Sequence, residues 1–243
     1  AENTWICEMG EFYGGWIRLR VKGPAGTEVK IRYSGRIRED GRILQQRQSQ
    51  NQSTDSYILK GDPDGEVYEP RFSYHPVRYI QIEGNIEPLS EDDITGRKIY
   101  NSVDLSGGFE CSNPMLNRIH QAVRRTMTNQ LFGIPLDCLY REHWGWTDPA
   151  TVTGTLFPRL YMPLFWRKWL NDFKEAQRAC GSVPDFAPDY LRRYGIDPAW
   201  GGNYPILIWY LYQYFGDVSF LKDHCRGLKR QVRYFQAAEE NGI

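Results

Sequence analysis

The sequence predicts a β-sandwich domain over residues 1–104, followed by an all-α region over residues 105–243. Three observations predict this division. In the first part, apolar and polar residues alternate with a period of two, as they do in half-buried strands. Turn residues, above all Gly and Pro, separate these short runs. In the second part, apolar residues recur every three or four positions, as they do on one face of a helix.

The first two strands are expected at Gly15–Val21 and Glu28–Tyr33, which both alternate with a period of two. Between them, the turn residues Gly23–Gly26 predict that the two strands form a hairpin. The polar, Gln-rich stretch Gln45–Thr54 is expected to be a long exposed loop.

Further strands are expected at Asp55–Lys60 and within Tyr68–Glu83. Pro76 interrupts the second run, so it marks a bulge, an edge or a break between two strands. We interpret His75 and Arg78 in this run as polar residues of the sheet surface rather than as ligand contacts.

The helical part opens with a well-marked helix. Asn113 is a favoured N-cap residue, and Pro114 takes the first helical position, where its missing N–H costs nothing. The apolar residues that follow at helical spacing are Leu116, Ile119, Val123, Met127 and Leu131. His120 lies near this stripe, which favours a packing role for it.

Four more helices are predicted downstream. A short one is expected at Thr153–Leu160, and a longer one should begin at Pro163 and end at Gly181. Pro205–Phe215 is apolar nearly all round, which predicts a helix buried on both sides. Asp217 is expected to cap the last helix. The apolar face predicted for that helix consists of Leu221, Cys225, Leu228, Val232 and Phe235.

Composition excludes several classes of function. Lys+Arg and Asp+Glu balance at 30 each, so the chain lacks the positive charge with which proteins bind nucleic acid or anionic membranes. No apolar run is long enough to span a bilayer. The 5 cysteines include no C-x-x-C pair, so free thiols are expected. Cys138, His143 and the nearby acids fit no common metal spacing, and we predict neither a metal nor another cofactor.

The chemistry of the chain is concentrated in Asp137–Asp148, which reads D-C-L-Y-R-E-H-W-G-W-T-D. Carboxylates that hold a proton near neutral pH need a partly dry, apolar wall. Sugars need the same combination, because their hydroxyls bind charged acceptors and their C–H faces stack on aromatic rings. The alternative is a purely structural loop, with Asp137 as a cap, Arg141 and Glu142 as a local ion pair, and the tryptophans in the core.

The pattern D-C-x-x-R-E-x-x-G-W closely resembles the signature of the bacterial α-L-rhamnosidases, inverting glycoside hydrolases with an (α/α)6 barrel. Two other stretches resemble the same family in the right order. The runs beginning G-G-W-I-R-L-R and Y-E-P-R-F-S-Y-H-P look like the β-sandwich domain that precedes the barrel. S-N-P-M-L-N-R-I-H looks like the opening helix of the barrel.

The resemblance implies roles for individual residues. Glu142 matches the general acid of the family, with Trp144 and Trp146 as the apolar wall that raises its pKa. Asp137 matches the acid that grips rhamnose hydroxyls, and Arg141 would hold the sugar or orient Glu142. Two further residues are predicted to bind the substrate: Trp200 as a sugar platform, and Asp148.

The chain departs from the family pattern at several positions. Leu139 and Tyr140 stand where the family usually has Pro and a polar residue. Pro149 and Gly202 stand where it usually has acids, and Asp148 is a candidate to replace the first of these. The departures leave two alternatives open: a non-catalytic sugar-binding or structural relative, or an (α/α)6 glycosidase of other specificity.

The helical part is too short for a complete (α/α)6 barrel. We count about five helices from Pro114 to Ile243, whereas the barrel has six pairs. We therefore expect the N-terminal portion of a larger protein, with the general base beyond Ile243 and no turnover by the 243 residues alone. Further barrel sequence or an oligomer partner should cover the apolar helix faces. The expected substrate is a rhamnose-containing oligosaccharide or glycoside.

Overall fold

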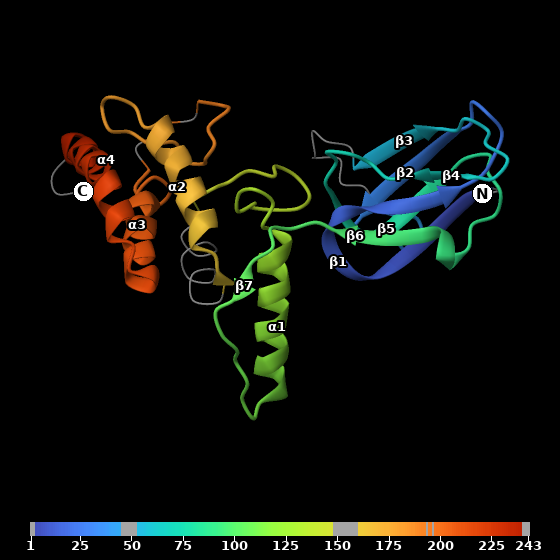
Figure 1. Ribbon diagram of the computed structural model, residues 1–243, viewed down its shortest axis with the longest axis horizontal. Helices are drawn as coiled ribbons and strands as arrows, with labels where there is room; N and C mark the ends of the chain where they lie inside the picture. The colour runs from blue at the N-terminus through green and yellow to red at the C-terminus, as the bar shows by residue number, and fades with distance from the viewer. Residues whose placement is uncertain (1–2, 45–52, 148–159, 193, 196, 240–243) are drawn as a thin grey trace. The chain divides into compact units, whose positions relative to one another are not determined.

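The computed structural model describes residues 3–44, 53–147, 160–192, 194–195 and 197–239. The chain divides into two compact units (Figure 1). The sheet unit contains Ala1–Tyr100 together with Cys138–Glu142, and the helical unit contains Asn101–Asp137 together with His143–Ile243. A sheet-rich domain followed by a helical region is the fold class that the sequence predicts. Most of the predicted loop Gln45–Thr54, and the predicted helix Thr153–Leu160 except for its last residue, lie outside the described residues.

The described residues of the sheet unit form six strands. They are β1 (Thr4–Val21), β2 (Glu28–Ser34), β3 (Thr54–Ile58), β4 (Glu66–Tyr68), β5 (His75–Glu83) and β6 (Ile94–Lys98). The short 3-10 helix η1 (Glu91–Asp93) leads into β6, a strand that the sequence patterns did not predict. The strand order is β3-β2-β5-β1-β4, and β6 pairs with β1.

Strand β1 is long enough to serve two parts of this sheet. Its first residues pair with β5, and its last residues pair with β6 and β4. The register with β5 shifts between Glu8 and Tyr13, as at a β-bulge, which bends a strand and increases its twist. The core of the sheet unit consists mainly of apolar residues from β1, β2 and β5. Among them, Ile17, Ile31 and Ile80 are fully buried.

The predicted hairpin between the first two strands is wrong. Both strands exist, but β5 lies between them and pairs with each. The connection Lys22–Thr27 crosses over rather than turning back onto β1. Pro76 lies near the start of β5, opposite Gly14 of β1. At this point of β5, strand β2 no longer pairs with it. A proline is tolerated there because that side of β5 needs no backbone donor.

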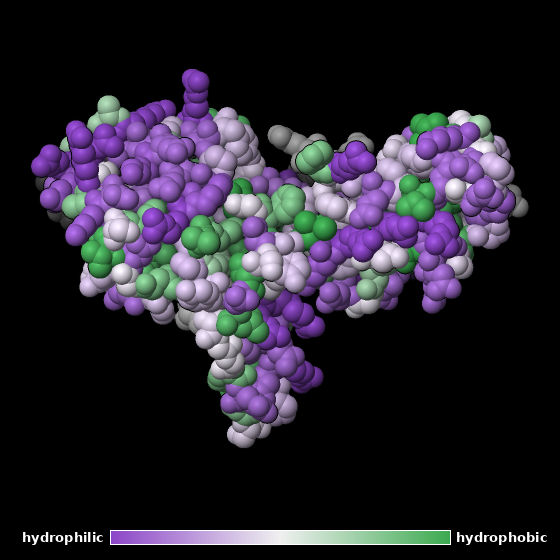
Figure 2. All heavy atoms as spheres, in the orientation of Figure 1, coloured by the Kyte–Doolittle hydropathy of each residue, from purple (hydrophilic) through white to green (hydrophobic). Residues whose placement is uncertain are grey.

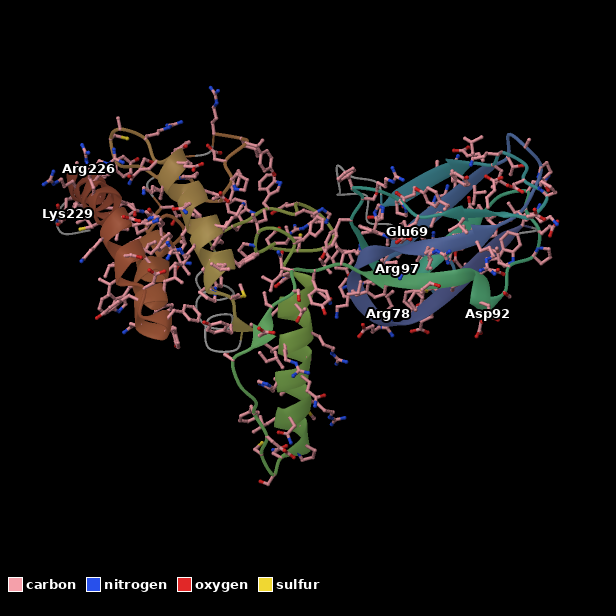
Figure 3. The ribbon with its side chains drawn as sticks, viewed as in Figure 1. Glu69, Arg78, Asp92, Arg97, Arg226 and Lys229 are labelled. Atoms are coloured by element: carbon pink, nitrogen blue, oxygen red, sulfur yellow. The ribbon has the colours of Figure 1, made fainter. Side chains whose placement is uncertain are left out.

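His75 is not a surface residue, contrary to the prediction. It is buried, stacks on Tyr33 at 4.2 Å, and its Nε2 lies 3.0 Å from Asp55 Oδ1. Tyr33 donates a hydrogen bond to the other carboxylate oxygen of Asp55 at 2.8 Å. Arg78 is exposed as predicted and pairs with Glu8 at 3.1 Å. Figure 3 shows Arg78 among the side chains of the sheet unit.

The helical unit contains α1 (Pro114–Asn129), α2 (Pro163–Ala176), α3 (Asn203–Phe215) and α4 (Val218–Ala238). A two-stranded sheet of β7 (Asp104–Leu105) and β8 (Leu160–Tyr161) joins the segment before α1 to the start of α2. The predicted caps are confirmed: Asn113 accepts from the Met115 N–H at 2.9 Å, and Asp217 accepts from the Phe220 N–H at 3.0 Å. α2 ends at Ala176, before the predicted Gly181.

Helices α2, α3 and α4 share one apolar core, in which Trp166, Trp169 and Phe173 are fully buried. Among the described residues, α3 is buried on one side only, so its burial on both sides stays a prediction for the complete protein. Leu207 and Leu211 are buried, but Ile206 and Trp209 on another face are 44% and 47% exposed. Helices α2 and α4 pack on α3, and that face stays exposed in the described part of the chain. Hydrophobic side chains also appear on the surface of this unit in Figure 2.

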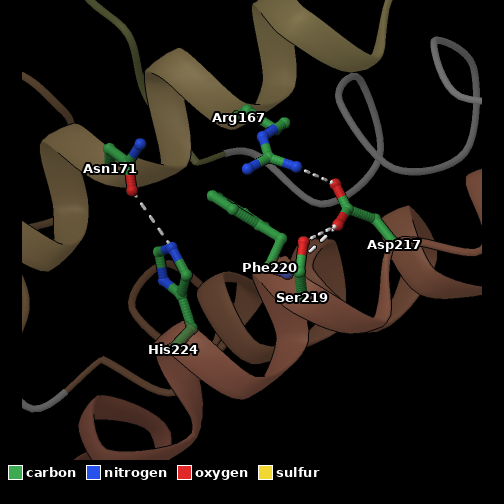
Figure 4. Close-up of polar contacts among 6 residues, drawn as sticks. All are labelled: Arg167, Asn171, Asp217, Ser219, Phe220 and His224. Atoms are coloured by element: carbon green, nitrogen blue, oxygen red, sulfur yellow. Dashed lines mark hydrogen bonds and ion pairs between the residues drawn. The ribbon is translucent and has the colours of Figure 1, made fainter.

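The buried face of α4 is displaced by one position along the helix from the predicted one. The buried residues are Phe220, His224, Gly227 and Gln231, whereas the predicted Cys225 and Val232 are exposed. Figure 4 shows His224 reaching Asn171 on α2. Gln231 donates to the Gly201 carbonyl, and the Gln177 side chain donates to the Gly227 carbonyl at 2.9 Å. Among the described residues, no helix is long and apolar enough to cross a membrane.

Candidate functional site

Three segments of the helical unit meet at the end of the predicted motif. The Ala187 N–H donates to the Gly145 carbonyl at 3.0 Å, and Trp146 forms a β-bridge with Phe186. The buried Thr147 continues this pairing, since its N–H donates to the Asp185 carbonyl at 3.2 Å. The motif therefore runs beside the loop at residues 185–187 as a short extended segment.

Thr147 also ties the motif to the start of α3. Its Oγ1 lies 2.9 Å from the Asp185 carbonyl oxygen and 2.7 Å from the Trp200 carbonyl oxygen. The Asn203 side chain at the start of α3 donates to the Thr147 carbonyl. One buried threonine thus holds three segments that are far apart in the sequence.

Glycine is required at position 145 because the neighbouring segment approaches its backbone closely. A Cβ there would lie 2.3 Å from the Ala187 carbonyl oxygen and 3.1 Å from Trp169 Nε1. Trp169 donates to the same Ala187 carbonyl at 2.9 Å. Any side chain at position 145 would therefore push the two segments apart.

Aromatic rings line this junction. Trp144 lies 5.0 Å from Phe186, 5.5 Å from Tyr190 and 5.6 Å from Trp146 between ring centroids. Trp200 lies 5.3 Å from Trp146. The three tryptophans are half-buried and Tyr190 is exposed, so ring surface remains in contact with solvent. Exposed aromatic faces of this kind can stack on the C–H face of a sugar.

The structure brings together three of the predicted site residues: Trp144, Trp146 and Trp200. It adds Phe186 and Tyr190, which the sequence analysis did not select. Their signal in the sequence was a loop with alternating prolines and acids, and nothing in that loop shows that its rings meet Trp144. The predicted Asp148 lies outside the described residues.

Asp137 closes the loop that carries the motif. Its Oδ1 accepts from the Trp144 N–H at 3.0 Å, and its own N–H donates to the Trp144 carbonyl at 3.0 Å. The Gln130 side chain donates to the Asp137 carbonyl at 3.1 Å. One carboxylate oxygen of Asp137 thus fixes the backbone. His143, inside the loop, has a φ of 57°, a left-handed conformation that few non-glycine residues adopt.

The middle of the motif, Cys138–Glu142, is grouped with the sheet unit rather than the helical unit. Leu139–Glu142 form a turn in which Leu139 is buried. Tyr140 stacks on Phe12 with 5.4 Å between ring centroids and an interplanar angle of 15°. Burial raises the pKa of Tyr140, and the positive charges of Arg36 and Arg78 partly offset this effect.

Arg141 and Glu142 follow in the same turn. Arg141 Nη2 lies 3.9 Å from Glu142 Oε1, and the two side chains are 52% and 32% exposed. This pair is at the outer limit of an ion pair, so it orients Glu142 loosely. The Glu142 side chain is partly exposed, so its carboxyl group is accessible from solvent.

Two other features of the described residues bear on chemistry. No group of three or more His, Cys, Asp or Glu side chains in them could hold a metal ion. An open cavity of about 590 Å³ lies in the helical unit, lined by residues such as Asp104, Tyr161 and Lys168. None of the predicted site residues that the structure describes lines this cavity.

Glycine at position 202 is explained by the lack of space for a side chain. A Cβ there would lie 1.9 Å from the Pro198 carbonyl oxygen. An acidic side chain therefore cannot occupy this position without a change in the backbone before α3. This turn instead presents Trp200, whose ring meets Trp146.

Comparisons with known proteins match both units. Residues 1–100 match the model of the bacterial α-L-rhamnosidase concanavalin-like domain, and residues 104–243 match that of the bacterial α-L-rhamnosidase 6 hairpin glycosidase domain. An α-L-rhamnosidase from Streptomyces avermitilis is 32% identical over 96% of this chain and 23% of its own length.

Solved structures agree with these matches. The structure of an α-L-rhamnosidase from Dictyoglumus thermophilum has a TM-score of 0.93 at 36% identity, covering 99% of this chain and 27% of that one. That of the Streptomyces avermitilis α-L-rhamnosidase complexed with L-rhamnose has a TM-score of 0.91 at 30% identity, covering 99% and 23%. The chain therefore spans about a quarter of the length of the relatives that it matches.

Proposed function

The chain belongs to the bacterial α-L-rhamnosidase family, and from this membership we propose that the complete protein hydrolyses terminal α-L-rhamnosides with inversion. The observation that carries the proposal is the motif Asp137–Thr147, which places an Arg-Glu pair beside solvent-facing tryptophans in the sequence. A similar protein has been solved with L-rhamnose bound, which supports the choice of sugar.

In this proposal Glu142 is the general acid. An inverting glycosidase uses two carboxyl groups about 6.5–9.5 Å apart. One protonates the leaving oxygen, and the other activates a water on the opposite face of the sugar. Glu142 takes the first role because it stands at the position of the acid in the family pattern R-E-x-x-G-W, and its side chain is accessible, with 32% of its surface exposed. We assign the general base to no residue of this chain.

The remaining motif residues are proposed to bind the sugar. Trp144, Trp146 and Trp200 offer stacking faces, and Arg141 offers hydrogen-bond donors to hydroxyls. Asp137, whose Oδ1 accepts from the Trp144 N–H, is proposed as an acceptor for sugar hydroxyls. Asp148 is proposed as a second acceptor. No metal or other cofactor enters this reaction scheme, since proton transfer by the two carboxyl groups is sufficient.

The test is hydrolysis of 4-nitrophenyl α-L-rhamnoside by the complete protein and its Glu142→Gln variant. General acid catalysis contributes about 10²- to 10⁴-fold, so the variant should lose activity in that range. The loss should be much smaller on a 2,4-dinitrophenyl rhamnoside, whose leaving group needs little protonation. Glu175→Gln, at an exposed carboxylate of α2, is the matched control. Unchanged activity of Glu142→Gln would remove Glu142 from its role.

Two alternatives have separate signatures. A sugar-binding relative without turnover is favoured by the glycine at position 202, where the family usually has an acid. It predicts that the wild-type protein binds L-rhamnose by calorimetry but hydrolyses no aryl glycoside. A glycosidase of other specificity predicts faster hydrolysis of another aryl glycoside in a panel. Either outcome would replace rhamnoside hydrolysis as the function.

A further inference from the structure

The turn that carries Glu142 rests on the sheet unit through one aromatic side chain. The Tyr140 ring lies almost parallel to Phe12 in β1, at 5.4 Å between centroids. A stacked aromatic pair contributes about 0.5–1.5 kcal/mol beyond the area that it buries. Leu139, the preceding residue, is buried, with 5% of its surface exposed.

Gly35, which directly follows β2, completes the seat for Tyr140. A Cβ at Gly35 would lie 2.2 Å from the Tyr140 Oη and 2.9 Å from the Phe12 ring. The tyrosine hydroxyl therefore occupies space that only a glycine leaves open. Phe12, Gly35 and Tyr140 form a fitted set contributed by three separate parts of the sequence, and we call the first two the Tyr140 seat.

We propose that Tyr140 is a positioning residue, which fixes the place of Glu142 by docking the turn Leu139–Glu142 into the Tyr140 seat. Glu142 is two residues away in the same turn, so the position of its backbone follows from that of Tyr140. The Arg141–Glu142 contact of 3.9 Å lies at the outer limit of an ion pair, so a fixed turn backbone adds to the positioning of the carboxyl group. The catalytic importance of this device rests on the proposed function, whereas the docking itself does not.

The expected effect on catalysis follows from how small a displacement of the acid proton transfer tolerates. A general acid must lie within hydrogen-bond reach of the atom that it protonates, and a displacement of about 1 Å can cost about 10²-fold in rate. Tyr140→Ala should therefore lower kcat by about 10- to 100-fold, while KM changes little. Tyr140→Phe keeps the stacked ring and should retain most of the activity.

Docking can be measured without activity, because Cys138 lies beside the turn. It is a half-buried free thiol, whereas Cys180 is an exposed one that serves as an internal reference. We would follow thiol labelling of the 243-residue chain by peptide-resolved mass spectrometry. Tyr140→Ala should speed labelling of Cys138 at least about fivefold relative to Cys180, and Tyr140→Phe should not. Equal ratios in the wild type and Tyr140→Ala would overturn the proposal.

Gly35 gives a second, independent perturbation. Gly35→Ala should expel the Tyr140 ring and raise Cys138 labelling, because its Cβ would collide with the hydroxyl. Adding Tyr140→Phe removes the nearest of the colliding atoms, the hydroxyl oxygen, and should restore part of the protection. Gly107→Ala is the matched control, since a Cβ at Gly107 would meet nothing within 4 Å. Absence of rescue in the double variant would contradict the fitted seat.

Hydrolysis assays distinguish the positioning role of Tyr140 from the assignment of Glu142 as the general acid. If Tyr140 positions the acid, Tyr140→Ala should lose much less activity on the 2,4-dinitrophenyl rhamnoside than on the 4-nitrophenyl rhamnoside. The same difference is expected for Glu142→Gln. A variant that is merely less stable would lose equally on both. If Glu142→Gln keeps full activity while Tyr140→Ala exposes Cys138, the docking holds and the acid assignment fails. Equal losses by Tyr140→Ala on both substrates would overturn the positioning role.

Discussion

Lowering the pH from 7.5 to 5 should weaken the helical unit through one buried histidine, His224. The Tyr204 hydroxyl contacts its Nδ1. Its Nε2 lies 3.2 Å from Asn171 Oδ1 (Figure 4). This pattern suits a neutral ring, which accepts from the tyrosine and donates to the asparagine. Burial lowers the pKa of His224 from 6.5 to about 4, and the positive charge of Lys174 adds to the effect.

The direction in which stability changes with pH follows from the pKa of His224 in the unfolded and in the folded chain. Because the folded pKa lies below the unfolded one, the unfolded chain binds a proton first as the pH falls. Stability from the neutral histidine is complete above pH 6.5 and is lost as the pH falls towards 4. For a pKa of 6.5 in the unfolded chain and about 4 in the folded one, the loss between pH 7.5 and 5 is about 2 kcal/mol.

The assay is urea unfolding followed by tryptophan fluorescence, because most tryptophans belong to the helical unit. Other groups also titrate, so the informative quantity is the difference between the wild type and His224→Gln, which stays neutral. The pH-dependent loss should be about 2 kcal/mol smaller in His224→Gln. His120→Gln, at a half-exposed histidine of α1, is the matched control. A difference below about 0.5 kcal/mol between the wild type and His224→Gln would refute the reasoning.

Three further outcomes are expected in urea unfolding. Gly145→Ala should cost about 2–4 kcal/mol, because its Cβ would lie 2.3 Å from the Ala187 carbonyl oxygen; Gly107→Ala should stay within about 0.5 kcal/mol, and equal effects would contradict the close approach. Thr147→Val should cost about 1–3 kcal/mol, since it removes a hydroxyl placed between two buried carbonyl oxygens; a neutral result would mean that these contacts contribute nothing. Asp55→Ala should destabilise the sheet unit by about 1–3 kcal/mol, because it leaves two buried polar partners without their acceptor; a stable variant would contradict that network.

Local signals in the sequence determined most of the elements and the motif. The caps at Asn113 and Asp217 mark helix starts that the structure confirms, because an N-cap is an interaction between near neighbours in the chain. The alternation in β1 and β2 likewise predicts strands, since side chains point to opposite faces of a strand in turn. The family signature in Asp137–Trp146 also stands in the sequence alone.

Only the tertiary structure decided which surfaces are buried and which strands are neighbours. Periodicity counts apolar residues, so it selected Cys225 for the buried face of α4 instead of His224, which is buried because Tyr204 and Asn171 satisfy its nitrogens. The same holds for His75, buried through Asp55. These partners are distant in the sequence, and no local pattern identifies them.

The sequence also did not show to which unit each part of the motif belongs. Its letters form one continuous signature, yet Cys138–Glu142 belongs with the sheet unit and Trp144 with the helical unit. What decides this is the fit of Tyr140 against Phe12 and Gly35, more than a hundred residues earlier in the chain. The sequence predicts which residues carry the chemistry, and packing between distant segments determines what holds each of them in place.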